Sequence, residues 1–351
     1  MRRALVLLFL GAGRLAADDA AGRELAADRH IVAGPEQGAT FVIYNYDAPG
    51  EGFNDPTLVA PVPGNPGTTL GQQRLSVFLA AASTWGRHLM SEIAIEVDAR
   101  FDELACSDSE ADLGAAFPVT VHRDFPGAPQ PATWYVEALA NSRAGEDLLF
   151  QISDIGATFS STIDAGDPGC IGGQSWWYGI GVPAPADTIG LFTTLLHELA
   201  HGLGFLSLHD RTTGAKFLGF DDAYLRLLYD ESSAEGWSTM TDAERLASQV
   251  NSGSLVWIGP EVTATLAGFD SGVSTAGFLR VYAPNPVQIG RSISHWDLGV
   301  SPIDLMAPVV TTTSRDYVAY RAMADLGWRL AVVFKDSFES GDDDFWSVAQ
   351  P

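Results

Sequence analysis

The sequence is poor in basic residues and in charge of either sign. Only 20 Lys and Arg stand against 44 Asp and Glu among its 351 residues, for a formal net charge of -24 at pH 7. A surface this acidic repels phosphate backbones and anionic lipid, so we expect no nucleic-acid partner. Charged residues make up 18% and hydrophobic residues 46% of the chain. This balance excludes an intrinsically disordered protein and supplies enough apolar residues for a core.

Long hydrophobic runs are also missing. No stretch is apolar over the roughly 20 residues that a membrane-spanning helix needs. The nearest is the run 4–10, which follows Arg2 and Arg3 and precedes small residues that end at Ala17. A basic start, a short apolar centre and a small-residue end are typical of a cleaved secretory signal peptide, here residues 1–17. We therefore expect a secreted or periplasmic protein, monomeric and without stable membrane insertion.

Cysteine is nearly absent, since Cys106 and Cys170 are the only two. In the oxidising compartment that a signal peptide implies, an even pair is best interpreted as one disulfide. The alternative is two buried free thiols. A single cross-link is a small constraint on a chain of this length, so the core must stabilise the fold.

The remainder of the chain is interpreted as one large folded domain with a loose segment at each end. Residues 18–38 are polar and Ala-rich, as in a short pro-segment or a flexible N-terminus. The predicted domain, 39–332, has an N-terminal part, 39–206, and a C-terminal part, 207–332. Residues 333–351 are interpreted as a tail.

Hydrophobic periodicity predicts mixed helices and strands, which together indicate an α+β fold. The expected helices are 69–89, 133–143, 189–203, 221–230, 241–251 and 317–326. The expected strands are 39–46, 93–101, 117–122, 147–152, 255–258 and 279–283.

The helix at 189–203 contains the most informative motif of the chain. His197 and His201 are four residues apart, so they share one face of the helix and can hold one Zn²⁺ at about 2.0–2.1 Å each. Glu198 would lie beside that ion, where it can accept a proton from a zinc-activated water. A chance His-Glu-x-x-His is expected only about 0.01 times in such a chain. The motif therefore predicts a hydrolytic zinc site with Glu198 as general base.

A third zinc ligand is needed, and the residues alone leave it open. In the common extended motif it is a histidine six residues after the second, but that position is Ser207. His209 and Asp210 lie just beyond. The preferred candidate is His295, which is far downstream and is followed by Asp297 as a further alternative.

Three segments together resemble the zinc endopeptidases of the metzincin clan. They are His-Glu-Leu-Ala-His-Gly-Leu-Gly-Phe at 197–205, Ser-His-Trp-Asp at 294–297 and Leu-Met-Ala-Pro at 305–308. The chain is most similar to the leishmanolysin-like branch, in which the third histidine follows an insertion and precedes a methionine-containing turn. The run 64–74 is also similar to a segment of secreted bacterial relatives. The likeness extends over most of 39–330, although only the histidine segments are specific.

This resemblance implies a zincin-like catalytic domain with an active-site helix and a smaller C-terminal part. It implies zinc on His197, His201 and His295, with Glu198 as general base and Met306 beneath the metal. The chain departs from the clan's usual pattern at Ser207 and lacks the usual tyrosine after the methionine. The implied activity is cleavage of protein or peptide substrates.

Two other functions remain open from the sequence. The same metal could serve an amidase or a peptidoglycan hydrolase, or zinc could be a structural clamp in a secreted binding or adhesion protein. Calcium is a second possible ion, because four carboxylates (Asp164, Asp167, Asp221 and Asp222) could bind it, but a solvated acidic surface is the preferred interpretation. Trp176, Trp177 and Tyr178 could line a cleft or fill the core.

Overall fold

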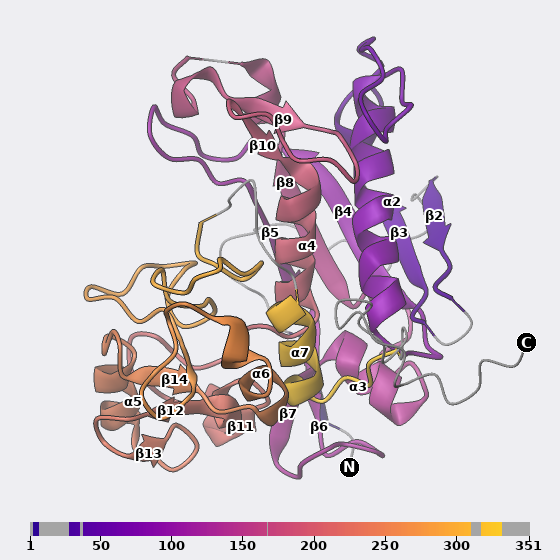
Figure 1. Cartoon of the computed structure of the whole chain (residues 1–351). Helices are drawn as coiled ribbons and strands as arrows, with labels where there is room; N and C mark the ends of the chain where they lie inside the picture. The colour runs from indigo at the N-terminus through magenta and orange to yellow at the C-terminus, as the bar shows by residue number, and fades with distance from the viewer. Residues whose placement is uncertain (1–2, 7–27, 36–37, 167, 310–316, 332–351) are drawn as a thin grey trace, which may run out of the picture.

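The computed structural model of the chain describes residues 3–6, 28–35, 38–166, 168–309 and 317–331 (Figure 1). The predicted signal peptide and pro-segment lie largely outside the described residues, and the predicted tail lies entirely outside them. None of the described helices is long and apolar enough to cross a membrane.

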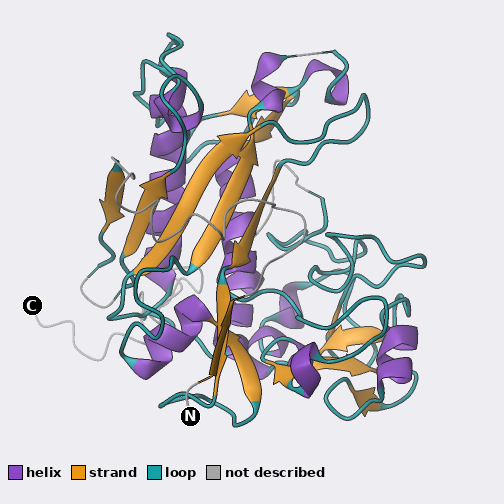
Figure 2. Ribbon diagram, turned by 180° about the vertical axis from the view of Figure 1, so that it is seen from behind, coloured by secondary structure: helices purple, strands orange, loops and turns teal. Residues whose placement is uncertain are grey.

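A five-stranded mixed sheet forms the centre of the N-terminal part, in the order β2–β3–β4–β8–β5. Its strands are β2 (Arg29–Val32), β3 (Phe41–Asn45), β4 (Ile95–Asp102), β5 (Gly114–Pro118) and β8 (Ile155–Ser160). β3, β4 and β8 are parallel, whereas β2 and β5 run antiparallel at the two edges. Figure 2 shows the sheet from the side opposite to that of Figure 1.

Two long helices, α2 (Leu70–His88) and α4 (Leu191–Gly202), pack on the same face of this sheet (Figures 1 and 2). A reciprocal capping box between Thr69 and Gln72 begins α2. The indole of Trp85 in α2 is fully buried and donates a hydrogen bond to the Leu196 carbonyl in α4 at 3.1 Å. This contact fixes α4 against α2 one residue before His197.

The other sheets are smaller. One joins β1 (Arg3–Val6), β6 (Thr120–Arg123), β7 (Thr133–Val136) and β11 (Asp221–Asp222). The C-terminal part contains β12 (Leu228–Asp230), β13 (Glu235–Gly236), β14 (Leu255–Trp257) and β15 (Leu279–Arg280). A parallel pair, β9 (Ser175–Trp177) and β10 (Thr188–Gly190), precedes α4. The remaining helices are α3 (Glu137–Ala144), α5 (Asp242–Ser248), α6 (Pro260–Thr263) and α7 (Tyr317–Leu326), with 3₁₀ turns η1 (Gly52–Asn54), η2 (Thr162–Ala165), η3 (Ile171–Gly173), η4 (Phe217–Gly219), η5 (Leu225–Leu227) and η6 (Leu266–Gly268).

The mixed helices and sheets agree with the expected α+β class, but several elements differ from the sequence-based prediction. The expected helix 133–143 is strand β7 up to Val136 and becomes helix α3 only at Glu137. The sequence Thr-Trp-Tyr-Val is rich in β-branched and aromatic residues, and β6 offers it a partner strand. The expected strand 147–152 is a turn, and the strand begins at Ile155 instead.

The predicted helix 221–230 is also wrong. This segment forms β11, η5 and β12 in succession. The buried carboxylate of Asp222 accepts hydrogen bonds from the backbone N–H groups of Leu208 and Leu225 at 2.8 and 2.7 Å. Such side-chain to backbone bonds compete with helical ones, and here they tie the segment to the loop after α4.

An aromatic cluster of Phe205, Tyr224, Trp257 and Trp296 joins the end of α4 to the C-terminal part. The ring of Phe205 lies 5.8 Å from Trp257 and 4.9 Å from Trp296, centroid to centroid. All four rings are at most 1% exposed. The cluster brings the segment around residue 295 beside the His-Glu-x-x-His motif of α4.

Candidate metal centre

The helix α4 presents His197 and His201 from its last two turns. Leu195 and Leu199 on the same helix are fully buried in the core. The helix begins two residues later than expected, at Leu191, with Gly190 at its N-cap. Its length and burial therefore fix the two histidines in a rigid element, one turn apart on the same face.

A glycine turn ends this helix directly after the motif. Gly204 adopts a φ of +118°, a conformation that L side chains rarely adopt. Its N–H donates to the His201 carbonyl at 3.0 Å, and the Phe205 N–H donates to the Ala200 carbonyl at 2.9 Å. The turn brings the Phe205 carbonyl within 2.8 Å of His201 Nδ1. The reversal of the chain thus orients the second imidazole.

His295 reaches the same place from the C-terminal part. Its backbone carbonyl accepts a hydrogen bond from the Tyr282 N–H at 2.9 Å, and its Nδ1 lies 2.7 Å from the Arg291 carbonyl. The Leu305 carbonyl in turn lies 2.7 Å from His197 Nδ1. Each of the three imidazoles is therefore oriented by one backbone carbonyl.

These carbonyls decide which ring nitrogens face one another. A carbonyl oxygen can only accept, so Nδ1 carries the proton in all three rings and Nε2 keeps its lone pair. The Nε2 atom of His197 lies 3.1 Å from that of His295 and 3.2 Å from that of His201. With no proton between them, three lone pairs at this separation repel one another unless a cation lies among them.

The spacing fits a small tetrahedral cation. Two nitrogens at 2.0–2.1 Å from zinc and at the tetrahedral angle are about 3.3 Å apart. The candidate ligand atoms of the three histidines all lie within 4.8 Å of one another, and in the described part of the chain this is the one group of metal-binding side chains so arranged. The three-histidine cluster could therefore hold a metal ion.

Burial keeps these imidazoles neutral. It lowers the pKa of His197 to about 4 and that of His201 to about 3, where His197 adds to the effect. Burial and the two neighbouring histidines lower the pKa of His295 well below its usual value. Neutral imidazole is the form that binds a metal.

Glu198 lies beside the cluster, with Oε1 4.0 Å from His197 Nε2. Its side chain is 13% exposed. Burial raises the pKa of this carboxyl to about 8, and a hydrogen bond from the Ala116 backbone N–H in β5 partly opposes the shift. A carboxyl with a pKa near neutrality suits proton transfer.

The other candidate ligands are occupied elsewhere. His209 Nδ1 lies 3.1 Å from Ser207 Oγ, and its Nε2 lies 3.3 Å from Gln249 Oε1. Asp210 accepts from the backbone N–H groups of its own turn, and Asp297 accepts from the Gly299 N–H. Of the candidates, His295 is the one that converges with the pair in α4.

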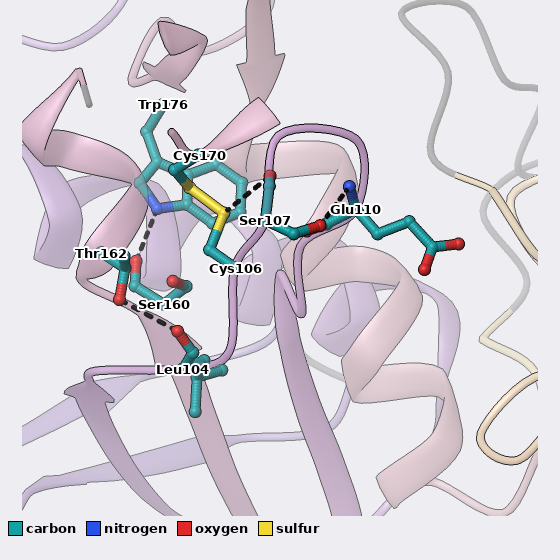
Figure 3. Close-up of a disulfide and its surroundings, with 8 residues drawn as sticks. All are labelled: Leu104, Cys106, Ser107, Glu110, Ser160, Thr162, Cys170 and Trp176. Atoms are coloured by element: carbon teal, nitrogen blue, oxygen red, sulfur yellow. Dashed lines mark hydrogen bonds between the residues drawn. A yellow bond between two sulfur atoms is a disulfide. The ribbon is translucent and has the colours of Figure 1, made fainter. Parts of the chain in front are cut away.

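The remaining predicted site residues lie around the centre or far from it. Met306 is fully buried and accepts a backbone hydrogen bond from the Trp296 N–H at 2.9 Å. Cys106 and Cys170 form the expected disulfide, which lies beside Trp176 of β9 (Figure 3), and β10, the partner strand of β9, leads into α4. The indole of Trp176 donates to the Ser160 carbonyl next to this disulfide, so it fills the core.

The aspartates considered for calcium do not form the solvated surface expected of them. Asp164 binds the buried Arg74 guanidinium and the Tyr178 hydroxyl, and Asp222 is 3% exposed. Asp221 forms ion pairs with Lys216 and Arg226. Asp167 lies outside the described residues. Protein donors already engage the three that are described.

Sequence reasoning missed the groups that orient the histidines. They are the backbone carbonyls of Arg291, Leu305 and Phe205, which no side-chain pattern can reveal. It also missed the buried carboxylate of Asp304, which lies in the turn that carries Leu305. The only signal for it was its place two residues before Met306.

Comparison of the chain with protein-family models, curated proteins and solved structures finds no match. The interpretation of the centre therefore rests on its own geometry.

Proposed function

We propose that this chain is a secreted zinc-dependent endopeptidase. The observation that carries the proposal is the convergence of three unprotonated Nε2 atoms, from His197, His201 and His295, beside the carboxyl of Glu198. A structural zinc site is normally closed by four protein ligands, whereas three ligands leave a position for water and substrate.

The chemistry divides between the ion and the chain. A zinc ion held by the three imidazoles would lower the pKa of a water molecule to near 7 and polarise a carbonyl oxygen. Glu198, beside the cluster, would take the proton of the attacking water and deliver it to the leaving amine. The carbonyls that bind the Nδ1 atoms keep the imidazoles in the tautomer that this arrangement needs.

The edge strand β5 favours a peptide substrate. Among the described residues, β5 has a partner strand, β8, on one side only, and the Ala116 N–H on its other side points to Glu198. An extended peptide can pair with such an edge through main-chain hydrogen bonds, which would carry its scissile bond past the general base.

The test is casein cleavage by the zinc-loaded protein, with Glu198→Gln as the decisive variant. We expect a fall in kcat of about 10²- to 10⁴-fold at unchanged zinc content. Glu261→Gln, which removes a surface carboxylate paired with Arg321, is the matched control and should keep full activity. A chelator should abolish cleavage by the wild-type protein.

Other results would replace this function. Release of peptidoglycan fragments without casein cleavage would indicate a metal-dependent amidase or peptidoglycan hydrolase. Equal behaviour of wild type and Glu198→Gln would indicate a binding or adhesion protein with a structural zinc.

A further inference from the structure

The carboxylate of Asp304 is 1% exposed and lies in the turn that follows the third histidine. Its Oδ1 accepts a hydrogen bond from the Trp296 indole at 2.9 Å and from the Met306 N–H at 3.2 Å. Its Oδ2 accepts from the Val318 N–H, at the start of α7, at 3.2 Å. One buried carboxylate thus joins three segments of the C-terminal part.

The first consequence concerns His197. The Met306 N–H donates a hydrogen bond to the Asp304 carboxylate, and the Ala307 N–H donates one to the Asp304 backbone carbonyl. Both hydrogen bonds close the turn around Leu305. The Leu305 carbonyl is held inside this turn, 2.7 Å from His197 Nδ1. The orientation of the His197 imidazole therefore depends on the Asp304 carboxylate, which holds the turn that carries the Leu305 carbonyl.

The second consequence concerns His295. Its neighbour Trp296 is held at two points, because the indole binds Asp304 and the backbone N–H binds the Met306 carbonyl at 2.9 Å. The indole is also fully buried in the aromatic cluster. Because Trp296 is held in place, the side-chain direction of the adjacent residue, His295, is also fixed.

We propose that Asp304 is a positioning residue of the metal centre and holds the two ligands His197 and His295 at their mutual distance. This inference rests on the part of the proposed function that places a metal ion among the histidines. Groups that orient ligands in this way typically change metal affinity by about 10- to 100-fold when removed.

The chain contains a closely matched control. The Asp325 carboxylate also accepts one indole N–H, from Trp257 at 2.9 Å, and two backbone N–H groups, from Glu261 and Val262 at 2.8 and 3.1 Å. The two indoles even pack against each other at 5.5 Å. Asp325 ties α6 to α7, however, and in the described part of the chain it accepts no hydrogen bond from Trp296 or from the turn around Leu305.

The experiment compares Asp304→Asn with Asp325→Asn in the full-length protein. Co²⁺ and Zn²⁺ affinities are measured by competition with a chelator, and the visible spectrum of bound Co²⁺ reports coordination geometry. Asp304→Asn should weaken Co²⁺ binding about 10- to 100-fold and alter the spectrum. Asp325→Asn should stay within about threefold of wild type, because its carboxylate orients no ligand. Equal affinities and spectra in the two variants would overturn the inference.

A second pair of variants tests the inference if the Asp304→Asn protein does not fold. Trp296→Phe keeps a six-membered aromatic ring but loses the N–H that binds Asp304 together with part of the indole. Trp257→Phe makes the same change at Asp325, so the loss of buried volume is matched between the two variants. Trp296→Phe should weaken Co²⁺ binding about tenfold and change the Co²⁺ spectrum. Trp257→Phe should leave both the affinity and the spectrum as in wild type. If wild type binds no Co²⁺, the proposed metal site fails together with this inference. If wild type binds Co²⁺ and Trp296→Phe matches it, only the role of Asp304 fails.

Discussion

The Nε2 atoms of His197 and His295 lie 3.1 Å apart although 98 residues separate the two histidines in the chain. No local preference can produce such a contact. It depends on the aromatic cluster, which packs the C-terminal part against the end of α4, and on the backbone carbonyls that turn each ring. The candidate metal centre is thus a product of tertiary packing.

Removing His295 should disrupt metal binding far more than removing His209, although His209 is nearer to α4 in the sequence. We expect His295→Ala to weaken zinc affinity by more than about 100-fold, beyond the usual effect of an orienting group, because a ligand is lost. His209→Ala should retain wild-type affinity, since His209 contacts Ser207 and Gln249 instead. Metal content after dialysis and chelator competition measure both. A loss of zinc in His209→Ala alone would contradict the assignment.

The glycine that ends α4 should be needed for the site as well as for the fold. Gly204→Ala places a side chain at a φ of +118°, which costs about 1–3 kcal/mol of unfolding free energy. It should also weaken metal binding about tenfold, because the Phe205 carbonyl that orients His201 moves. The control is Gly145→Ala, at the end of α3, where φ is +70° and no atom lies within 4 Å of the new Cβ. That variant should lose stability in urea titrations but keep its metal affinity.

Stability should depend on the protonation of Asp222. Burial raises the pKa of this carboxyl from 3.8 to about 6, so the folded state retains a proton that the unfolded chain has released. Between these values the free energy of unfolding should fall as the pH rises, by up to about 3 kcal/mol.

Urea titrations from pH 4 to pH 7 test this dependence. Asp222→Asn has no such proton and should lack this decrease. Ser207→Ala removes a hydrogen bond that favours the charged form, so it should extend the decrease to higher pH. An unchanged slope in Asp222→Asn would contradict the assignment.

The disulfide should stabilise the fold without contributing to the centre. It links residues 64 positions apart, and closing a loop of that size in the unfolded chain is worth about 4 kcal/mol. The double variant Cys106→Ser, Cys170→Ser should therefore unfold at lower urea concentration. Its zinc affinity under native conditions should match that of wild type, because the disulfide lies beside Trp176 of β9, whose partner β10 precedes α4, whereas His201 is in the last turn of α4. A large loss of zinc affinity would show that the two regions are coupled.

The parts of the centre that the sequence could predict are those with local causes. His197, Glu198 and His201 share one helical turn and a helix face, so their spacing alone indicated a shared role. The helix 69–89 was predicted within one or two residues because its capping box and apolar spacing agree.

The parts that could not be predicted depend on partners distant in sequence. Residues 133–136 form a strand because β6 lies beside them, although their apolar pattern continues into a helix. The segment around Asp222 is not helical because the Asp222 carboxylate accepts a hydrogen bond from the Leu208 N–H in the loop after α4. Backbone carbonyls orient all three imidazoles, and any residue type could have supplied them.

The distance in sequence between α4 and His295 has a consequence for when the candidate metal centre can form. A polypeptide that ends before residue 295 retains His197, His201 and the Glu198 carboxyl but lacks the third imidazole of the cluster. Hydrolysis of the proposed kind would thus require the segment around residue 295 to be synthesised and packed against α4 first.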